Sequence, residues 1–291
     1  MERSLPGGTR GILHARTGLE RFRIERFEPP AALAAFVANF WVLRWDLRGR
    51  PPHRQRVITR PSVHMTFTSY LTAGTTRARI AGVVRDDFVE EIHGEGRVVG
   101  AAFRPGGFRP FMDAPVSTLT GRFPGVDEVF GEEGPALAEE VFATADAREA
   151  IGRLAAFLSG RDPEPDPAAG RAAAIVERIA SWPGLVRVDA LAADVGLSAR
   201  SLQRLFHEYV GIGPKWVIRR FRMQEAAERA ASGTGVDWAD LAADLGYADQ
   251  AHFTRDFTAA VGTSPARYAR EAGPDEETGR DEETGPGRID A

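Results

Sequence analysis

The pattern of hydrophobic and polar positions divides the chain into a strand-rich part and a helical part. Segments that alternate between the two kinds of residue, or that are rich in β-branched and aromatic residues, occur at 21–28, 40–47, 63–70 and 95–103. Such segments are typical of β-strands. Helical periodicity follows at 135–143 and 147–158. The first 160 residues therefore predict a β-rich domain with flanking helices.

The C-terminal part contains two copies of a helix-turn-helix pattern. Residues 191–206 read LAADVGLSARSLQRLF, and residues 241–257 read LAADLGYADQAHFTRDF. In each copy, apolar residues fall at helical spacing on both sides of a glycine, which is Gly196 in the first copy and Gly246 in the second. A glycine ends a helix readily because it adopts the left-handed conformation without strain. Each copy thus predicts two short helices that meet at a glycine turn.

The two copies also match beyond their turns. Allowing for one inserted residue in the second turn, Leu202, Arg204, Phe206, Gly211 and Pro214 correspond to Phe253, Arg255, Phe257, Gly262 and Pro265. A side chain that can cap the second helix precedes it in both copies, Ser198 in the first and Asp249 in the second.

The second helix of each copy offers polar side chains of the kinds that contact DNA. Arginine can bridge O6 and N7 of guanine, glutamine can pair with adenine, and hydroxyl groups suit phosphate oxygens. The candidate DNA-binding residues are Ser198, Arg200, Gln203 and Arg204 in the first copy and Gln250, His252, Thr254 and Arg255 in the second. Periodicity alone fits equally well a helical repeat with solvated polar faces.

Composition marks the domain boundaries. Residues 161–170, RDPEPDPAAG, carry three prolines and no apolar period, which predicts a linker between a domain at 1–160 and a domain at 171–270. Residues 271–291 hold 8 Asp/Glu against 2 Lys/Arg and no aromatic residue, which predicts a disordered acidic tail. Residues 171–270 hold 13 Lys/Arg against 11 Asp/Glu. This balance is too mild to indicate a nucleic-acid partner by charge alone.

The sequence argues against several kinds of catalytic site. The chain has no cysteine, which excludes a thiolate zinc site and a cysteine nucleophile. His53, His64 and His93 do not stand at metal-ligand spacing, and we expect them to pack or face solvent. We expect no metal, no catalytic residue and no cofactor. No apolar run approaches the ~20 residues that cross a bilayer, so we expect no membrane contact and a cytoplasmic location.

Residues 246–270, GYADQAHFTRDFTAAVGTSPARYAR, resemble the signature of AraC-type (AraC/XylS) transcription regulators. The first copy is similar to that family's other helix-turn-helix, and residues 213–230 resemble its linker helix, with Met223 in place of the usual leucine. The resemblance implies that one chain reads two successive major grooves, ~34 Å apart along the duplex. Asp256 also departs from the family pattern, and this acid beside the second polar face is expected to lower affinity for DNA.

The N-terminal half carries a second, weaker resemblance. VVGAAFRPGGF at 98–108 and PVSTLTGRFPGVDEVFG at 115–131 resemble an uncharacterised β-rich domain found ahead of the AraC-type module. That resemblance implies a cupin-like barrel that senses a signal. The expected fold class is therefore α+β multidomain, with an N-terminal β-rich cupin-like barrel and flanking helices before a C-terminal all-α double helix-turn-helix.

These observations together predict a bacterial, non-enzymatic, sequence-specific transcription regulator that binds double-stranded promoter DNA. A small-molecule effector in the N-terminal domain and a contact with RNA polymerase remain open as further partners. The alternative is a metal-dependent cupin-like enzyme fused to a DNA-binding module. A fused DNA-repair alkyltransferase would need acceptor cysteines, which the chain lacks.

Overall fold

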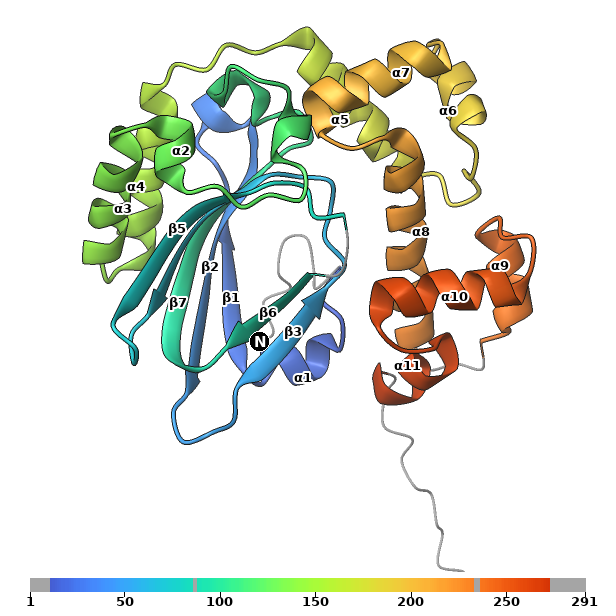
Figure 1. Ribbon diagram of the computed structural model, residues 1–291, viewed down its shortest axis with the longest axis horizontal. Helices are drawn as coiled ribbons and strands as arrows, with labels where there is room; N and C mark the ends of the chain where they lie inside the picture. Colours follow the sequence, from blue (N-terminus) through green and yellow to red (C-terminus); the bar gives the residue numbers. More distant parts are fainter. Residues whose placement is uncertain (1–10, 86–87, 233–235, 273–291) are drawn as a thin grey trace, which may run out of the picture.

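The computed structural model describes residues 11–85, 88–232 and 236–272, in a β-rich N-terminal part and a helical C-terminal part (Figure 1). The N-terminal elements are α1 (Ala15–Leu19), β1 (Phe22–Phe27), η1 (Ala31–Leu33), β2 (Val37–Leu47), β3 (His53–Val57), β4 (His64–Tyr70), β5 (Thr75–Ala81), β6 (Phe88–Ile92), β7 (Gly94–Phe103), η2 (Arg109–Phe111), η3 (Val116–Leu119), α2 (Val126–Phe130), α3 (Glu133–Ala143) and α4 (Ala147–Gly160). The C-terminal elements are α5 (Pro167–Ala180), α6 (Val188–Asp194), α7 (Ala199–Leu205), η4 (Phe206–Val210), α8 (Pro214–Ala231), α9 (Trp238–Asp244), α10 (Gln250–Val261) and α11 (Pro265–Ala272). The acidic tail expected at 271–291 lies, from residue 273 onward, outside the described residues.

Five antiparallel strands form the main sheet in the order β1-β2-β7-β4-β5. Because successive side chains of a strand point to opposite faces, each row of cross-strand partners belongs to one face. One such row is apolar throughout and consists of Phe27, Phe40, Ala101, Met65 and Ile80. This row packs against the N-terminal helices.

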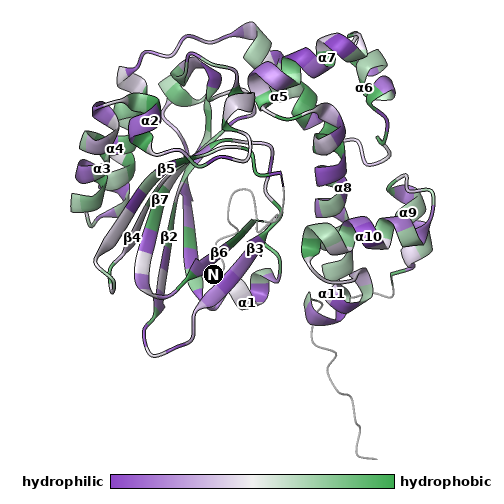
Figure 2. Ribbon diagram, viewed as in Figure 1, coloured by the Kyte–Doolittle hydropathy of each residue, from purple (hydrophilic) through white to green (hydrophobic). Residues whose placement is uncertain are grey.

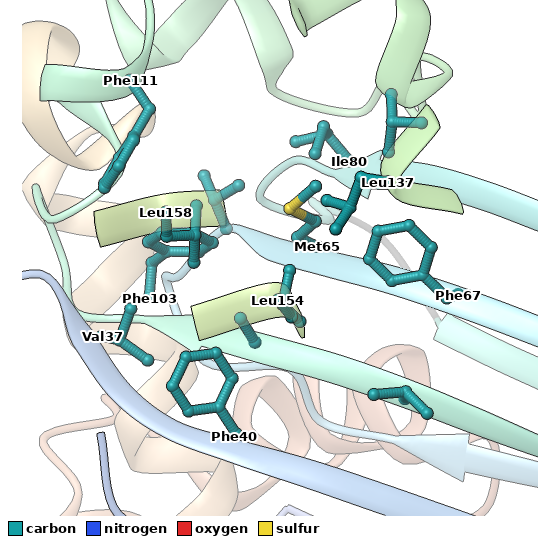
Figure 3. Packing of buried hydrophobic residues seen from close by; sticks show 14 of the residues in the cluster. Val37, Phe40, Met65, Phe67, Ile80, Phe103, Phe111, Leu137, Leu154 and Leu158 are labelled. Atoms are coloured by element: carbon teal, nitrogen blue, oxygen red, sulfur yellow. The ribbon is translucent and has the colours of Figure 1, made fainter. Parts of the chain in front are cut away.

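The main hydrophobic core lies between the sheet and α3 and α4 (Figure 3). Phe40 and Met65 from the sheet are 0% exposed, as is Leu154 from α4. Leu154 and Leu158 stand four residues apart on one face of α4, the spacing at which a helix presents side chains to a sheet. The helices predicted at 135–143 and 147–158 are thus present, with ends that differ by two residues.

The opposite face of the sheet turns toward a separate two-stranded ribbon formed by β3 and β6 (Figure 1). Trp45 and Phe22 of the sheet pack with Ile92 of the ribbon. The expected α+β multidomain class is confirmed, but in the described residues the strands form an open sheet and a ribbon rather than a closed cupin-like barrel. After β3, the carbonyl groups of Ile58 and Thr59 accept hydrogen bonds from α8, and the chain joins the main sheet at β4.

The segment between the two parts is shorter than the sequence suggests. Helix α5 begins at Pro167, so the last four residues of the linker expected at 161–170 are helical. Pro167 suits the first helical position because its missing N–H would have no partner there. Asp166 caps the helix by accepting from the N–H of Ala168 at 2.7 Å.

The helical part holds two further cores, one for each predicted helix-turn-helix. The first is built around Leu202 and Phe206, and the second around Phe253 and Phe257, all 0% exposed. Helix α8 contributes to both cores, with Val217 in the first and Ala226 in the second. Figure 2 shows bands of hydrophilic and hydrophobic residues on these helices, as expected for elements that bury one face.

Candidate nucleic-acid interface

The first helix-turn-helix consists of α6 and α7, which meet at Gly196. Gly196 has a φ of 63°, the left-handed conformation that ends α6. The hydroxyl of Ser198 accepts from the N–H of Ser201 at 3.1 Å and so caps α7. Leu202 is fully buried below α7, while Arg204 on the other face is exposed. The turn and the cap therefore present one face of α7 to solvent.

The second helix-turn-helix, α9 and α10, repeats this geometry. Gly246 has a φ of 76°, and Asp249 caps α10 by accepting from the N–H of His252 at 2.6 Å. Phe253 and Phe257 bury the inner face of α10.

The correspondence continues to the next helix in each copy. Gly211 and Gly262 have φ of 88° and 86°, and Pro214 and Pro265 open α8 and α11. The copies differ in one respect: α7 ends at Leu205 and continues as the π-helical turn η4, whereas α10 is a single helix of 12 residues. We call α6–α7 with η4 the first head and α9–α10 the second head.

The structure places the candidate residues on the two exposed helix faces. Seven of them are exposed, namely Ser198, Arg200, Gln203, Arg204, Gln250, His252 and Arg255, while Thr254 is half-buried. The hydroxyl of Ser198 serves as the cap, and Arg255 donates to the carbonyl of Ala251 at 3.4 Å.

Residues 191–271 match a family described as a helix-turn-helix domain, and residues 25–123 match a domain of unknown function. The probable transcription factor PqrA of Proteus vulgaris is 32% identical over 93 residues, which make up 32% of this chain and 75% of PqrA. The chain belongs to the AraC-type family of transcription regulators. The expectation of a DNA-binding helix-turn-helix regulator is thereby confirmed, in a family that is usually non-enzymatic.

Two solved structures are similar with lower sequence identity. A probable AraC family regulator from Rhodopseudomonas palustris is 25% identical with a TM-score of 0.32, and the match covers 38% of this chain and 100% of that one. ToxT from Vibrio cholerae is 11% identical with a TM-score of 0.36, and the match covers 87% and 98% of the two chains. Because both TM-scores are low, the family assignment depends on the sequence matches.

Asp256 of this AraC-type regulator is not a free acid beside the reading face. Its carboxylate lies 2.7 Å from Arg219 of α8 and accepts from the hydroxyl of Tyr247 at 3.1 Å. The Asp256 side chain is only 17% exposed. Arg219 partly offsets the charge of this acid, and its expected effect on DNA affinity stays a prediction. Asp256 also ties α10 to α8.

The acids at the ends of α6 and α9 are paired in the same way. Asp194 binds Arg178 of α5 through two hydrogen bonds of 2.9 Å, and Asp244 lies 3.1 Å from Arg229 of α8. Asp194 and Asp244 occupy the same place in the two LAAD segments. Each head is thus fastened to a neighbouring helix by an equivalent ion pair.

Arg222 joins α8 to the end of α5, a helix that shares a core with the first head. The side chain is 2% exposed, and Nη2 donates to the carbonyl oxygens of Ile179 at 2.8 Å and Trp182 at 2.7 Å, where α5 ends. Nη1 lies 2.6 Å from Glu225. Burial lowers the pKa of Arg222, and Glu225 opposes this effect.

The sequence interpretation missed a polar stripe on α8 that contacts the N-terminal domain. Nε1 of Trp216 donates to the carbonyl of Arg85 at 3.1 Å. Arg220 donates to the carbonyl of Thr59 at 3.1 Å and to its hydroxyl at 2.9 Å. Gln224 donates to the carbonyl of Ile58 at 2.8 Å. Trp216, Arg220 and Gln224 stand four residues apart on one helix face, a spacing that is readable in the sequence but does not identify the partner.

The N-terminal domain also contacts the first head. Arg109 lies 2.8 Å from Glu208 of η4, and the hydroxyl of Thr120 donates to the carbonyl of Gly211 at 2.5 Å. Ser117 lies 3.1 Å from the ring of His207.

Apolar and aromatic side chains join the N-terminal domain to the second head and to α11. Leu13 and Ile58 belong to the core that contains Phe257, and the rings of His14 and Tyr268 lie 4.8 Å apart. One domain therefore touches both heads and the helix between them.

The three histidines of the N-terminal domain have protein partners. His53 lies 3.3 Å from Gln55, and His93 stacks on Tyr70 at 5.1 Å. Burial lowers the pKa of His64 to about 4. Across the residues that the structure describes, no three His, Asp or Glu side chains gather where a metal ion would fit, and no helix is long and apolar enough to cross a membrane.

Proposed function

We propose that this regulator reads two successive major grooves, with the first head in one groove and the second head in the next. The observation that carries the proposal is the pair of equivalent exposed faces on α7 and α10. The side chains of Arg200, Gln203 and Arg204 on α7 form no hydrogen bond or ion pair with any described residue, and neither does that of Gln250 on α10. Exposed arginine and glutamine side chains without protein partners are suited to base edges and phosphates.

The length of α8 supports this spacing. Its 18 residues span about 27 Å, the first head lies at one end, and the second head packs along the other (Figure 1). Successive major grooves on one face of the duplex are ~34 Å apart. Val217 of α8 lies in the core of the first head, and Arg219 ties α8 to α10 of the second head, so the heads can meet both grooves without a large change of shape.

Within this interface, we assign base contacts to Arg204 and Arg255, because they occupy equivalent places on the two helices. Gln203, His252 and Thr254 flank them on the same faces. Ser198, Arg200 and Gln250 lie near the turns, where phosphate contacts are the more suitable role. Ser198 can keep its capping bond and redirect its hydroxyl proton from Oγ of Ser201 to a phosphate oxygen.

We further propose that the N-terminal domain conveys a signal to the heads through its contacts with η4, α8 and α11. Such a regulator would act on promoter DNA in a bacterial cytoplasm, with RNA polymerase as a further contact.

Selection of a bound duplex from a random pool by the full-length chain, followed by fluorescence anisotropy on the selected operator, tests the DNA interface. Arg204→Ala and Arg255→Ala should each weaken operator binding by about 1–3 kcal/mol, or about 5- to 150-fold, and relax base preference at one sub-site. The two variants should relax different sub-sites. Arg153→Ala, an exposed arginine on α4, is the matched control and should bind as the wild type does. Unchanged preference in both head variants would contradict the assignment.

A further inference from the structure

A polar row of residues crosses the whole main sheet on the face opposite the helices. Its members are cross-strand partners on β1, β2, β7, β4 and β5, namely Arg26, Trp41, Gly100, Thr66 and Arg79. The next row, on the helix-covered face, is entirely apolar. The polar row therefore belongs to the face that turns toward the β3–β6 ribbon.

Three side chains of this row hold buried N–H groups without an acceptor among the described residues. These groups are Nη1 of Arg26, Nε1 of Trp41 and Nε of Arg79. A buried donor without a partner costs about 1–3 kcal/mol, and folded proteins contain few of them. In the described part of the chain, the other unpaired buried side-chain atoms lie on α8, in Arg222 and Gln224. Three unpaired N–H groups in one row indicate a place where a bound molecule supplies the hydrogen-bond acceptors.

Two tryptophans of β2 provide a comparison within the protein. Trp41 lies over Gly100 and Trp45 over Gly96, since a Cβ atom at either glycine would come within 2.7 or 2.2 Å of the indole ring. Nε1 of Trp45 donates to the carbonyl of His93 at 2.9 Å, whereas Nε1 of Trp41 has no acceptor in the described structure. A tryptophan packed on a glycine of β7 can therefore have a hydrogen-bond acceptor for its indole N–H. The missing acceptor at Trp41 is not a consequence of this packing.

Arg26 also lacks a partner that comparable arginines of this protein have. Burial lowers the pKa of Arg26, and no carboxylate of the described residues opposes that effect. Burial also lowers the pKa of Arg79 and Arg222, but Glu90 and Glu225 respectively pair with them. Arg26 is therefore a half-buried cation without a counter-charge in the described structure.

Part of the face that carries this row is less deeply buried than the helix-covered face. Trp41, Leu43 and His64 on it remain partly exposed, whereas Phe40 and Met65 on the opposite face are 0% exposed. Gly100 adds no side chain between Trp41 and Thr66. The unpaired N–H groups are themselves covered, so a ligand reaches them through a change of rotamer, for which the long Arg26 side chain has the freedom.

We propose that this face binds a small organic carboxylate, held by the guanidinium of Arg26 and the indole N–H of Trp41. The two residues are direct cross-strand partners, whose Cα atoms lie about 5 Å apart, so their side chains can reach one functional group. A guanidinium and a carboxylate form paired, charge-assisted hydrogen bonds. The ligand's negative charge would compensate Arg26, which a neutral ligand cannot do.

The β3–β6 ribbon connects this site to α8. The effect of a ligand on α8 rests on the proposed function, whereas the binding of the carboxylate does not. Glu90 of β6 holds Arg79 of the polar row, and β6 pairs along β3. The two residues after β3, Ile58 and Thr59, accept the hydrogen bonds of α8. A ligand that shifts the ribbon therefore acts directly on the contacts of α8.

Indole N–H resonances of ¹⁵N-tryptophan-labelled full-length protein test the binding site. Acetate, succinate, citrate and phenylacetate are the probes, with acetamide, succinamide and phenylacetamide as neutral counterparts. At least one carboxylate should move one indole resonance downfield in a saturable manner, and that resonance should be absent from Trp41→Phe. Arg26→Gln should weaken the binding about 10-fold or more, since a hydrogen bond to a charged group contributes about 1.5–3 kcal/mol.

Trp45→Phe is the matched control, and it should bind the carboxylate as the wild type does. Titration calorimetry of the carboxylate into Arg26→Gln measures the loss of affinity without the need for the Trp41 variant. Absence of any shift of the Trp41 resonance, equal shifts with the amides, or undiminished affinity in Arg26→Gln would each overturn the proposal. Operator binding is measured separately by anisotropy, so a failure here is distinct from a failure of the DNA interface.

Discussion

The contact between Arg220 and Thr59 allows a quantitative test of how firmly the N-terminal domain holds α8. Arg220 is 7% exposed and makes hydrogen bonds of 3.1 and 2.9 Å to the carbonyl and hydroxyl of Thr59. Thr59→Val removes only the hydroxyl, so it should cost about 1.5–3 kcal/mol, as expected for a hydrogen bond to a charged group. Arg220→Met removes both bonds and the cation–π contact with Trp216 at 5.1 Å, and it should cost about 2–4 kcal/mol.

A double-mutant cycle on the full-length chain, measured by thermal melting, isolates the pair. Once Arg220 is replaced, the Thr59 hydroxyl keeps only a long bond of 3.4 Å to the carbonyl of Val84, so the double variant should melt close to Arg220→Met alone. Each kcal/mol corresponds to about 2–4 °C in a chain of this order of size. Ser232→Ala, at the exposed end of α8, is the control and should change little. If the two single decrements add, the guanidinium and the hydroxyl do not interact, and the docking of α8 on Thr59 is wrong.

Three further predictions follow from single side chains. Phe257→Ala should destabilise the second head by about 3–5 kcal/mol through the cavity it leaves, and unaltered melting would contradict its place in the core. Asp256→Asn should weaken operator binding mainly at the second sub-site, because it loosens the link between α10 and α8, whereas repulsion between the acid and DNA would predict tighter binding. The pKa of His64 is about 4 in the folded protein and ~6.5 in an unfolded chain, so the unfolded state binds the proton first. Stability should therefore be full above pH ~6.5 and fall toward pH 4 in the wild type, with a shallower slope in His64→Gln.

The parts of the fold that the sequence predicts are those that periodicity determines locally. Leu202 and Phe206 are four residues apart, as are Phe253 and Phe257, and each pair buries one face of its own helix. Gly196 and Gly246 end helices for a reason that is intrinsic to glycine, and Ser198 and Asp249 cap within three residues of their position. These features need no distant partner.

Features that depend on distant partners could not be predicted in this way. Arg220 finds Thr59 at a separation of 161 residues, and no local spacing encodes that pair. Asp256 looks like a solvated acid on a polar face until Arg219 is placed beside it. Strand β3 reads HRQRV, which lacks an apolar alternation because the strand lies in a two-stranded ribbon rather than in the main sheet. In the described residues β3 and β6 pair only with each other, so the strands do not close into the expected barrel.

Helix α8 packs stably in the second head through one face and contacts the N-terminal domain reversibly through another. Met223, Ala226 and Ala230 bury an apolar face in the second head, so separating that head would expose apolar surface to water. Arg220 and Gln224 meet the N-terminal domain through hydrogen bonds, which water can replace at a small net cost. Polar interfaces between domains are the ones that open and close, whereas large apolar interfaces persist.

Apolar residues of the N-terminal domain enter both helical cores, Val83 the core of the first head and Leu13 and Ile58 that of the second. Undocking at either place would expose apolar side chains on both sides, so these contacts should be the last to break. The hydrogen bonds of Thr120 with Gly211 and of α8 with Thr59 are polar and are the ones that water can replace. We therefore expect a signal in the N-terminal domain to act first on these polar contacts, while the apolar contacts keep both heads docked on the domain.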